Sequence, residues 1–247
     1  FINLILEGLI VFNIARNISS LPGRRSQFSH IQIILISEDA AKEVLEDFLD
    51  FFYREPEMSL NAPVMITRGK ARDYLFGNPM IENTLGSQIQ KQLNFSANLA
   101  GKTIRSSLLE LAFQLKSESE TAMLPYLLTE PTYDQRIVQG IALIKKGKMD
   151  HWVDPEKAEY LLMLANKYRY GVLEIPCDPH SSDSRTETIE VFKVSTRMNP
   201  ELRESSVAVQ FDVRVEGGIG ELVCTTIRDP QDEKWFIDKL ELYMEEQ

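Results

Sequence analysis

The run Ile31-Gln32-Ile33-Ile34-Leu35-Ile36 decides how this chain folds. A continuous apolar stretch of this length between polar residues indicates a buried strand. A helix is expected to begin at Ser37, because Glu38 and Asp39 would lie in its first turn and suit the helix dipole. Its apolar stripe would consist of Val44, Leu45, Phe48, Leu49 and Phe52.

Strands and helices alternate on either side of this strand. Toward the N-terminus, residues 1–6 read as a strand and residues 10–18 as a short helix. After the central helix, residues 61–67 are strand-like and residues 69–75 form a short helical segment. The order strand, helix, strand, helix, strand, helix predicts an α/β sandwich.

The middle of the chain is expected to be mainly helical. Residues 84–117 hold two helical patterns, and Thr103 is a candidate cap for the second. Residues 123–129 form a candidate strand that contains Pro125, which would make it an edge strand because proline cannot donate to a neighbouring strand.

The C-terminal part reads as hairpins around one helix. Asp154-Pro155 is a good helix start, with Asp at the cap and Pro at the first position. The expected strands are 137–144, 172–175, 186–198 and 205–216, with a tight turn at 146–148, a closing Gly217-Gly218 and an acidic helical segment at 235–246.

These patterns predict a mixed α+β and α/β fold with several domains, each a β-sheet flanked by helices. Breaks at Asn78-Pro79 and Glu130-Pro131 suggest three domains: residues 1–78, a mainly helical 79–135 and an α/β 136–247. The chain opens at Phe1 inside an apolar stretch, so we expect the first domain to lack its start.

Composition excludes some function classes. The net charge of −10 argues against a nucleic-acid groove and against broad docking on anionic lipid headgroups. No apolar run reaches the length of about 18 residues that a membrane span needs. The two cysteines, Cys177 and Cys224, do not form a C-x-x-C pair that would suggest a zinc or redox motif.

No catalytic, metal or cofactor site is predicted. The three histidines show no H-x-x-x-H or H-E-x-x-H spacing, and the loop with Asp178 and Asp183 lacks the D-x-D-x-D-G pattern of a calcium site. Gly217-Gly218-Ile219-Gly220 follows a long strand and reads as a turn or bulge rather than a phosphate-binding loop.

Three residues are candidates for contact with a partner protein. Arg24 and Arg25 stand just before the buried strand, and Arg is enriched at protein interfaces. The alternative is a solvated loop whose arginines pair with Glu38 or Asp39. His30 is either a partner contact or a residue anchored by hydrogen bonds at the strand entry.

Four segments, in this order, resemble the Ger(x)C family, the C subunits of spore germinant receptors. They are FNIARNIS at residues 12–19, GRRSQFSHIQIILISE at 23–38, VMITRGKARDYL at 64–75 and GIALIKKGKMDHW at 140–152. The chain departs from the family in three ways. It has no N-terminal lipobox with a lipidated cysteine, His151 stands where the family usually has Gly, and Gln247 precedes the family's closing elements, so we expect an incomplete final domain.

The resemblance implies a lipoprotein of three α/β domains on the outer face of the inner spore membrane. Its partners would be the integral membrane A and B subunits of the receptor, with no nucleic acid and no cofactor. It would support assembly or signalling in nutrient-triggered germination and would not be an enzyme. Two alternatives stay open: an extracytoplasmic small-molecule-binding module with a pocket between domains, and an enzyme whose site leaves no motif.

Overall fold

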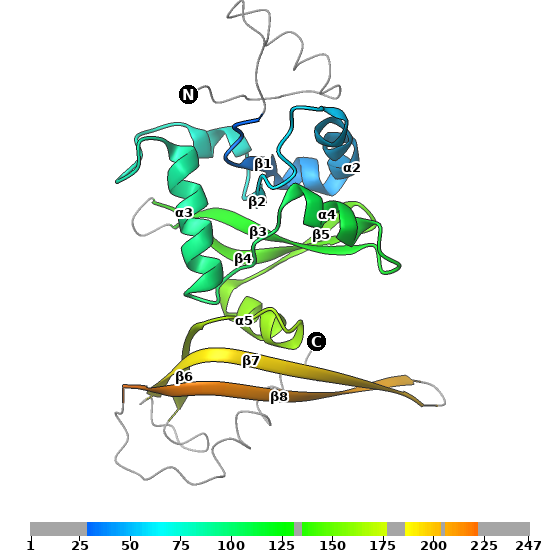
Figure 1. Cartoon of the computed structure of the whole chain (residues 1–247), viewed down its shortest axis with the longest axis vertical. Helices are drawn as coiled ribbons and strands as arrows, with labels where there is room; N and C mark the ends of the chain where they lie inside the picture. Colours follow the sequence, from blue (N-terminus) through cyan, green and yellow to red (C-terminus); the bar gives the residue numbers. More distant parts are fainter. Residues whose placement is uncertain (1–28, 131–134, 177–185, 204–205, 222–247) are drawn as a thin grey trace, which may run out of the picture. The chain divides into compact units, whose positions relative to one another are not determined.

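The computed structural model describes residues 29–130, 135–176, 186–203 and 206–221, which form two compact units (Figure 1). The first unit runs to Pro155, without Ala97–Lys102, and the second holds that short segment and the chain from Glu156 onward. The expected strand at 1–6 and the expected helices at 10–18 and 235–246 lie outside the described residues.

A five-stranded mixed sheet organises the first unit. Its strands are β1 (Ile34–Ser37), β2 (Val64–Thr67), β3 (Thr121–Glu130), β4 (Gln135–Lys145) and β5 (Lys148–Val153), and their sequence order is also their order in the sheet. Strands β1, β2 and β3 are parallel, whereas β4 and β5 continue as antiparallel hairpins. The carboxyl ends of the three parallel strands therefore share one edge of the sheet.

The helices of the first unit begin where the sequence offers caps. Helix α2 (Glu38–Arg54) starts after Ser37, whose hydroxyl accepts the Ala40 N–H at 3.4 Å, as the sequence predicted. Helix α4 (Leu108–Leu115) is capped by Ser107 in a capping box with Glu110, not by Thr103. The Thr103 hydroxyl is buried and donates to the Gly140 carbonyl at 2.6 Å, so it anchors a strand instead.

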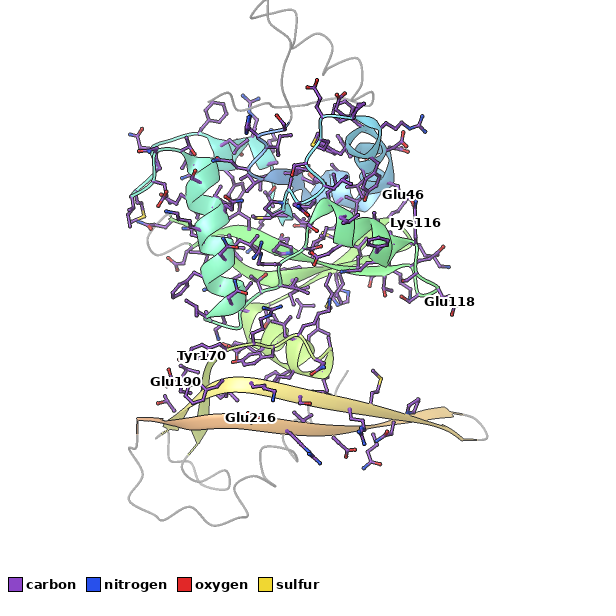
Figure 2. The ribbon with its side chains drawn as sticks, in the orientation of Figure 1. Glu46, Lys116, Glu118, Tyr170, Glu190 and Glu216 are labelled. Atoms are coloured by element: carbon purple, nitrogen blue, oxygen red, sulfur yellow. The ribbon has the colours of Figure 1, made fainter. Side chains whose placement is uncertain are left out.

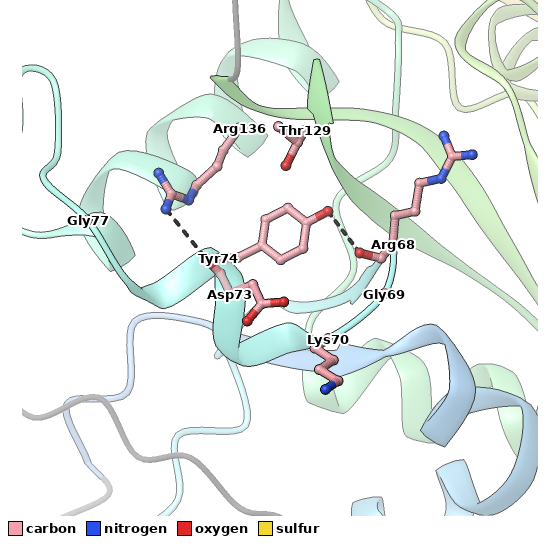
Figure 3. A pocket seen from close by; sticks show the side chains of 8 residues that line it. All are labelled: Arg68, Gly69, Lys70, Asp73, Tyr74, Gly77, Thr129 and Arg136. Carbon is pink, nitrogen blue, oxygen red and sulfur yellow. Dashed lines mark hydrogen bonds between the residues drawn. The ribbon is translucent and has the colours of Figure 1, made fainter. Parts of the chain in front are cut away.

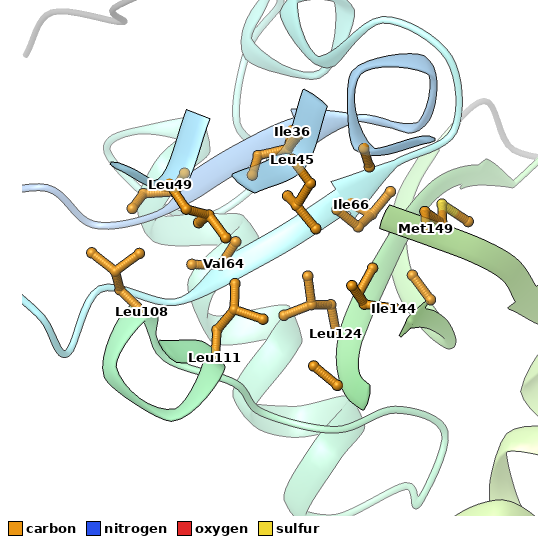
Figure 4. Packing of buried hydrophobic residues seen from close by; sticks show 14 of the residues in the cluster. Ile36, Leu45, Leu49, Val64, Ile66, Leu108, Leu111, Leu124, Ile144 and Met149 are labelled. Carbon is orange, nitrogen blue, oxygen red and sulfur yellow. The ribbon is translucent and has the colours of Figure 1, made fainter. Parts of the chain in front are cut away.

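Two apolar cores cover the two faces of this sheet. Because neighbouring strand residues point to opposite faces, Ile66 and Met65 enter different cores. Ile66 packs in the larger core, to which α2 contributes Leu45 and α4 contributes Leu111 (Figure 4). Met65 packs in the smaller core together with Ile89, Leu93, Tyr74, Leu127 and Val138; Ile89 and Leu93 come from α3 (Leu85–Asn98).

The structure corrects two expectations about this region. Strand β3 is central rather than an edge strand, and it accommodates Pro125 at a register shift between Pro125 and Leu127. The breaks at 78/79 and 130/131 do not separate sheets, because the single sheet takes strands from all three expected segments. They mark connections inside one unit, while the 69–75 segment forms a 3-10 turn, η1 (Ala71–Leu75).

The second unit contains helix α5 (Pro155–Leu164) and an antiparallel sheet in the order β6-β7-β8. Its strands are β6 (Gly171–Pro176), β7 (Thr186–Arg203) and β8 (Ser206–Glu221). The Tyr170 hydroxyl donates to the Glu190 carboxylate beside the start of β6 (Figure 2). Strand β8 runs through Gly217 and Gly218, where the sequence predicted an end, because both glycines pair with β7.

Candidate functional site

A polar pocket of about 570 Å³ opens at the carboxyl edge of the five-stranded sheet (Figure 3). The end of β2 leads into it, and Thr129 of β3 faces Arg136 of the antiparallel β4 across the register of the two strands. In open sheets with parallel strands, ligands bind outside the carboxyl ends of the strands. The lining residues are Arg68, Gly69, Lys70, Asp73, Tyr74, Gly77, Thr129 and Arg136.

The loop that follows β2 is held by hydrogen bonds to the sheet and to itself. The Arg68 N–H donates to the Leu127 carbonyl at 2.9 Å, and the Thr67 hydroxyl donates to the Gly69 carbonyl at 3.2 Å. Tyr74 from η1 donates its hydroxyl to the Arg68 carbonyl at 2.9 Å (Figure 3). Gly69 has a φ of 71°, in the left-handed region that favours glycine. These contacts give the pocket floor a defined shape.

Arg136 closes one side of the pocket. Its guanidinium donates to the Phe76 carbonyl and, at 3.4 Å, to the Asp73 carbonyl. A Cβ placed on Gly77 would lie 3.4 Å from that guanidinium, and Gly77 itself has a φ of 105°. The Arg136 side chain therefore ties the loop after η1 to strand β4, across sixty residues of sequence.

The pocket is electropositive although the chain is acidic. Lys70 and Arg136 contribute two positive side chains, against the single carboxylate of Asp73, whereas Arg68 lines the pocket but holds its guanidinium over the Trp152 ring. Within the described ranges, none of the three cationic groups lies at ion-pair distance from a carboxylate. Burial raises the pKa of the Tyr74 phenol, although a hydrogen bond with Thr129 acts in the opposite direction. Tyr74 thus stays a protonated donor at neutral pH.

A second polar cluster lies at the same edge but is closed. The Glu38 carboxylate accepts hydrogen bonds from Tyr126 at 2.6 Å and from Lys42 at 2.5 Å. Burial alone would raise the pKa of Glu38, but these two hydrogen bonds, together with the positive charges of Lys42 and Arg68, outweigh it and lower that pKa. The Tyr126 ring packs 5.5 Å from the ring of Trp152, over which the Arg68 guanidinium lies at 5.8 Å. Arg68 therefore stands between the closed cluster and the open pocket.

The pocket is not where the sequence placed its candidates. Arg24 and Arg25 lie outside the described residues, and His30 is exposed in a turn before β1 and does not line the pocket. Their role in partner contact stays a prediction. The Arg68-Gly69-Lys70 stretch directly after a buried strand was the available signal for the pocket, whereas Arg136 joins it only through the strand register.

The described part of the chain holds neither a metal-ligand cluster nor a membrane-spanning helix. No cluster of three or more His, Cys, Asp or Glu side chains there could hold a metal ion. No helix in those ranges combines the length and the apolar character needed to cross a membrane.

Two family models match the chain consecutively. The spore germination protein N-terminal domain matches residues 4–129, and the spore germination B3/GerAC like, C-terminal, domain matches residues 139–247.

Individual relatives agree with these matches. Spore germination protein KC of Bacillus subtilis (strain 168) is 22% identical, over 86% of this chain and 56% of its own length. Spore germination protein GerQC of Bacillus cereus is 24% identical, over 88% and 58%. The chain thus spans little more than half the length of these curated relatives.

The fold itself has a solved counterpart. The crystal structure of the GerBC protein superposes with a TM-score of 0.58 at 20% identity, over 86% of this chain and 60% of that one. At this identity the likeness supports the fold, which is the mixed α+β arrangement predicted from the sequence. Together with the consecutive family matches, it completes the assignment: the chain belongs to the GerAC-like family of spore germination proteins.

Proposed function

We propose that this chain is part of a non-enzymatic lipoprotein subunit of a nutrient germinant receptor. The subunit would be anchored on the outer face of the inner spore membrane and would serve assembly or signalling. The observation that carries the proposal is the consecutive match of both GerAC-like domains across residues 4–129 and 139–247. Spore germination is the role that the names of the related proteins share.

Exposed apolar side chains in the first unit support a role in contacting partners. Phe76, Met80 and Ile81 are 55%, 63% and 89% exposed on the connection between η1 and α3. Large apolar side chains that gather on a surface mark protein or membrane contacts. We name these three residues the apolar loop, and we assign it, with Arg24, Arg25 and His30, to contact with the integral membrane A and B subunits.

Deleting the gene in the organism that encodes the protein tests the germination role. We expect spores of the deletion strain to lose optical density more slowly after nutrient addition, and the full-length gene to restore the rate. Germination triggered by a treatment that bypasses nutrient receptors, such as high pressure, serves as the control and should be unchanged. An unchanged response to every nutrient that germinates the parent strain would refute the role.

A specific observation favours the second candidate function, a small-molecule-binding module. The pocket lies inside the first unit rather than between domains, and several of its lining groups are hydrogen-bond donors. A receptor subunit that also binds a small ligand would combine both functions. Direct binding measurements on the isolated chain separate this possibility from the germination role.

A further inference from the structure

We propose that the pocket formed by Lys70, Tyr74, Thr129 and Arg136 binds an oxyanion, in the chemical class of carboxylates and phosphates. This site goes beyond the receptor-subunit proposal and does not depend on it. It would give the chain a ligand of its own, at the edge of the sheet where its parallel strands end.

The balance of charge favours an anion. The whole chain carries −10, yet the pocket sets the Lys70 and Arg136 side chains against one carboxylate, Asp73, while the Arg68 guanidinium lies over Trp152. Like charges that lie close together repel each other unless an anion or solvent screens them. A bound oxyanion would relieve this repulsion and would be attracted by a local field opposite in sign to that of the rest of the chain.

The hydrogen-bond donors of the pocket also favour an oxyanion. The Lys70 ammonium carries three donors, and no acceptor within the described residues takes one. The Arg136 guanidinium carries five N–H donors. One of its nitrogens donates to the Phe76 and Asp73 carbonyls, so the remaining N–H groups can still bind a ligand. A guanidinium fork matches the geometry of carboxylate and phosphate oxygens. Thr129 adds a hydroxyl beside Tyr74 (Figure 3).

The volume and the preorganised side chains of the pocket suit a small ligand. A volume of about 570 Å³ lies within the range of small-molecule sites. A Cβ placed on Gly69 would meet no atom within 4 Å, so the loop faces open space there. Arg136 is already fixed by two backbone carbonyls, which lowers the entropy lost when it binds a ligand.

The oxyanion can belong to a soluble molecule or to a lipid headgroup. The apolar loop of Phe76, Met80 and Ile81 begins two residues after Tyr74 of the pocket and is exposed. Exposed apolar side chains beside cationic groups suit the interface of an anionic membrane. The experiment therefore tests both sources with separate probes.

The test uses the full chain at low ionic strength. Inorganic phosphate and acetate are titrated and followed by NMR shifts of the Gly69 and Gly77 amides, and sedimentation is measured with vesicles of phosphatidylglycerol or of phosphatidylcholine. We expect saturable binding that Lys70→Gln weakens by about tenfold, the loss typical of one hydrogen bond to a charged group. Lys148→Gln, at an exposed position of β5, removes the same charge elsewhere and should change the affinity by less than twofold.

Each outcome of these measurements either supports the oxyanion site or overturns it. Saturation by phosphate or acetate that Lys70→Gln weakens indicates a soluble ligand. Sedimentation with phosphatidylglycerol only, also weakened by Lys70→Gln, indicates a lipid headgroup. Absence of binding to all probes, or equal weakening by Lys70→Gln and Lys148→Gln, would overturn the site. These readouts do not involve germination, so a failure here leaves the receptor-subunit proposal standing.

Discussion

The two faces of the five-stranded sheet differ at the edge where the parallel strands have their carboxyl ends. On the face under α2 and α4, Glu38 is paired with Lys42 and Tyr126, and the surrounding core is continuous. On the face under α3, the core stops at Tyr74, and within the described ranges the Lys70 and Arg136 side chains beyond it form no ion pair with a carboxylate. The same edge of the sheet thus serves stability where the charges are paired and favours binding where they are not.

The largest effect is expected in the closed core. Leu45→Ala removes a side chain with no exposed surface in the larger core and should lower the free energy of unfolding by about 2–5 kcal/mol. Leu60→Ala is the control, because Leu60 is 43% exposed and should cost about 1 kcal/mol or less. Urea unfolding followed by fluorescence gives both values, and equal losses would contradict the assignment of the core.

Gly140 and Gly69, both with positive φ, allow a direct comparison of a tightly packed position with an open one. A Cβ on Gly140 would lie 2.5 Å from the Trp152 Nε1 and 2.7 Å from the Val153 carbonyl, so Gly140→Ala should cost about 2–4 kcal/mol. Gly69→Ala meets open space and should cost only the backbone strain, about 1–2 kcal/mol. Thermal and urea unfolding of both variants measure the difference; a larger loss for Gly69→Ala would reverse the comparison.

Loss of a hydrogen bond to the Glu38 carboxylate should have an intermediate, pH-dependent effect on the free energy of unfolding. Tyr126→Phe removes one hydrogen bond to Glu38 and should cost about 1–2 kcal/mol at neutral pH. The pKa of Glu38 in the folded state lies below its ordinary 4.5, so ionised Glu38 stabilises the fold above that pH. This stability is lost as the pH falls through the folded pKa, and the difference between the two proteins should shrink there.

Tyr53→Phe is the control for that measurement. The Tyr53 hydroxyl makes only a 3.5 Å contact with the Leu108 carbonyl, and burial raises the pKa of Tyr53 to about 12. Removing the Tyr53 hydroxyl should lower the free energy of unfolding by less than removing the Tyr126 hydroxyl. The loss should not depend on pH between about 3 and 7, the range in which carboxylates titrate. A constant difference for Tyr126→Phe across this range would contradict the role of Glu38.

The smallest effect is expected in the pocket. Lys70 is exposed and its ammonium has no partner in the described ranges, so Lys70→Gln should change the free energy of unfolding by less than about 0.5 kcal/mol. Urea unfolding measures it beside the anion titration. A loss above about 1 kcal/mol would mean that Lys70 belongs to the structure rather than to a binding site.

Local signals in the sequence predicted the frame of the fold. The apolar run before Ser37 and the acidic residues after it predicted β1 and α2, because both depend on neighbouring residues. The sequence also holds the signal for the cap of α4, because Ser107 and Glu110 form a capping box, so the prediction of Thr103 as the cap is wrong. Pro125 misled for a different reason: a bulge lets a central strand tolerate proline, and a bulge is set by pairing with another strand.

The pocket was harder to predict, because its residues meet only through the sheet. Arg68 and Lys70 follow β2 directly, but Thr129 and Arg136 join them through the pairing of β3 with β4. No spacing along the chain encodes that register. Arg24 and Arg25, predicted from their place just before the buried strand, lie outside the described residues, so their role stays a prediction.

Co-purification from spores tests the central claim most directly. The full-length protein, tagged and expressed from its own locus, would be extracted from spore membranes with mild detergent, captured and examined by mass spectrometry, with an unrelated tagged spore lipoprotein as the control. Our account predicts recovery of two integral membrane proteins in constant ratio to the tagged chain and absent from the control. Recovery of the tagged protein alone, under conditions that keep other membrane complexes intact, would contradict it.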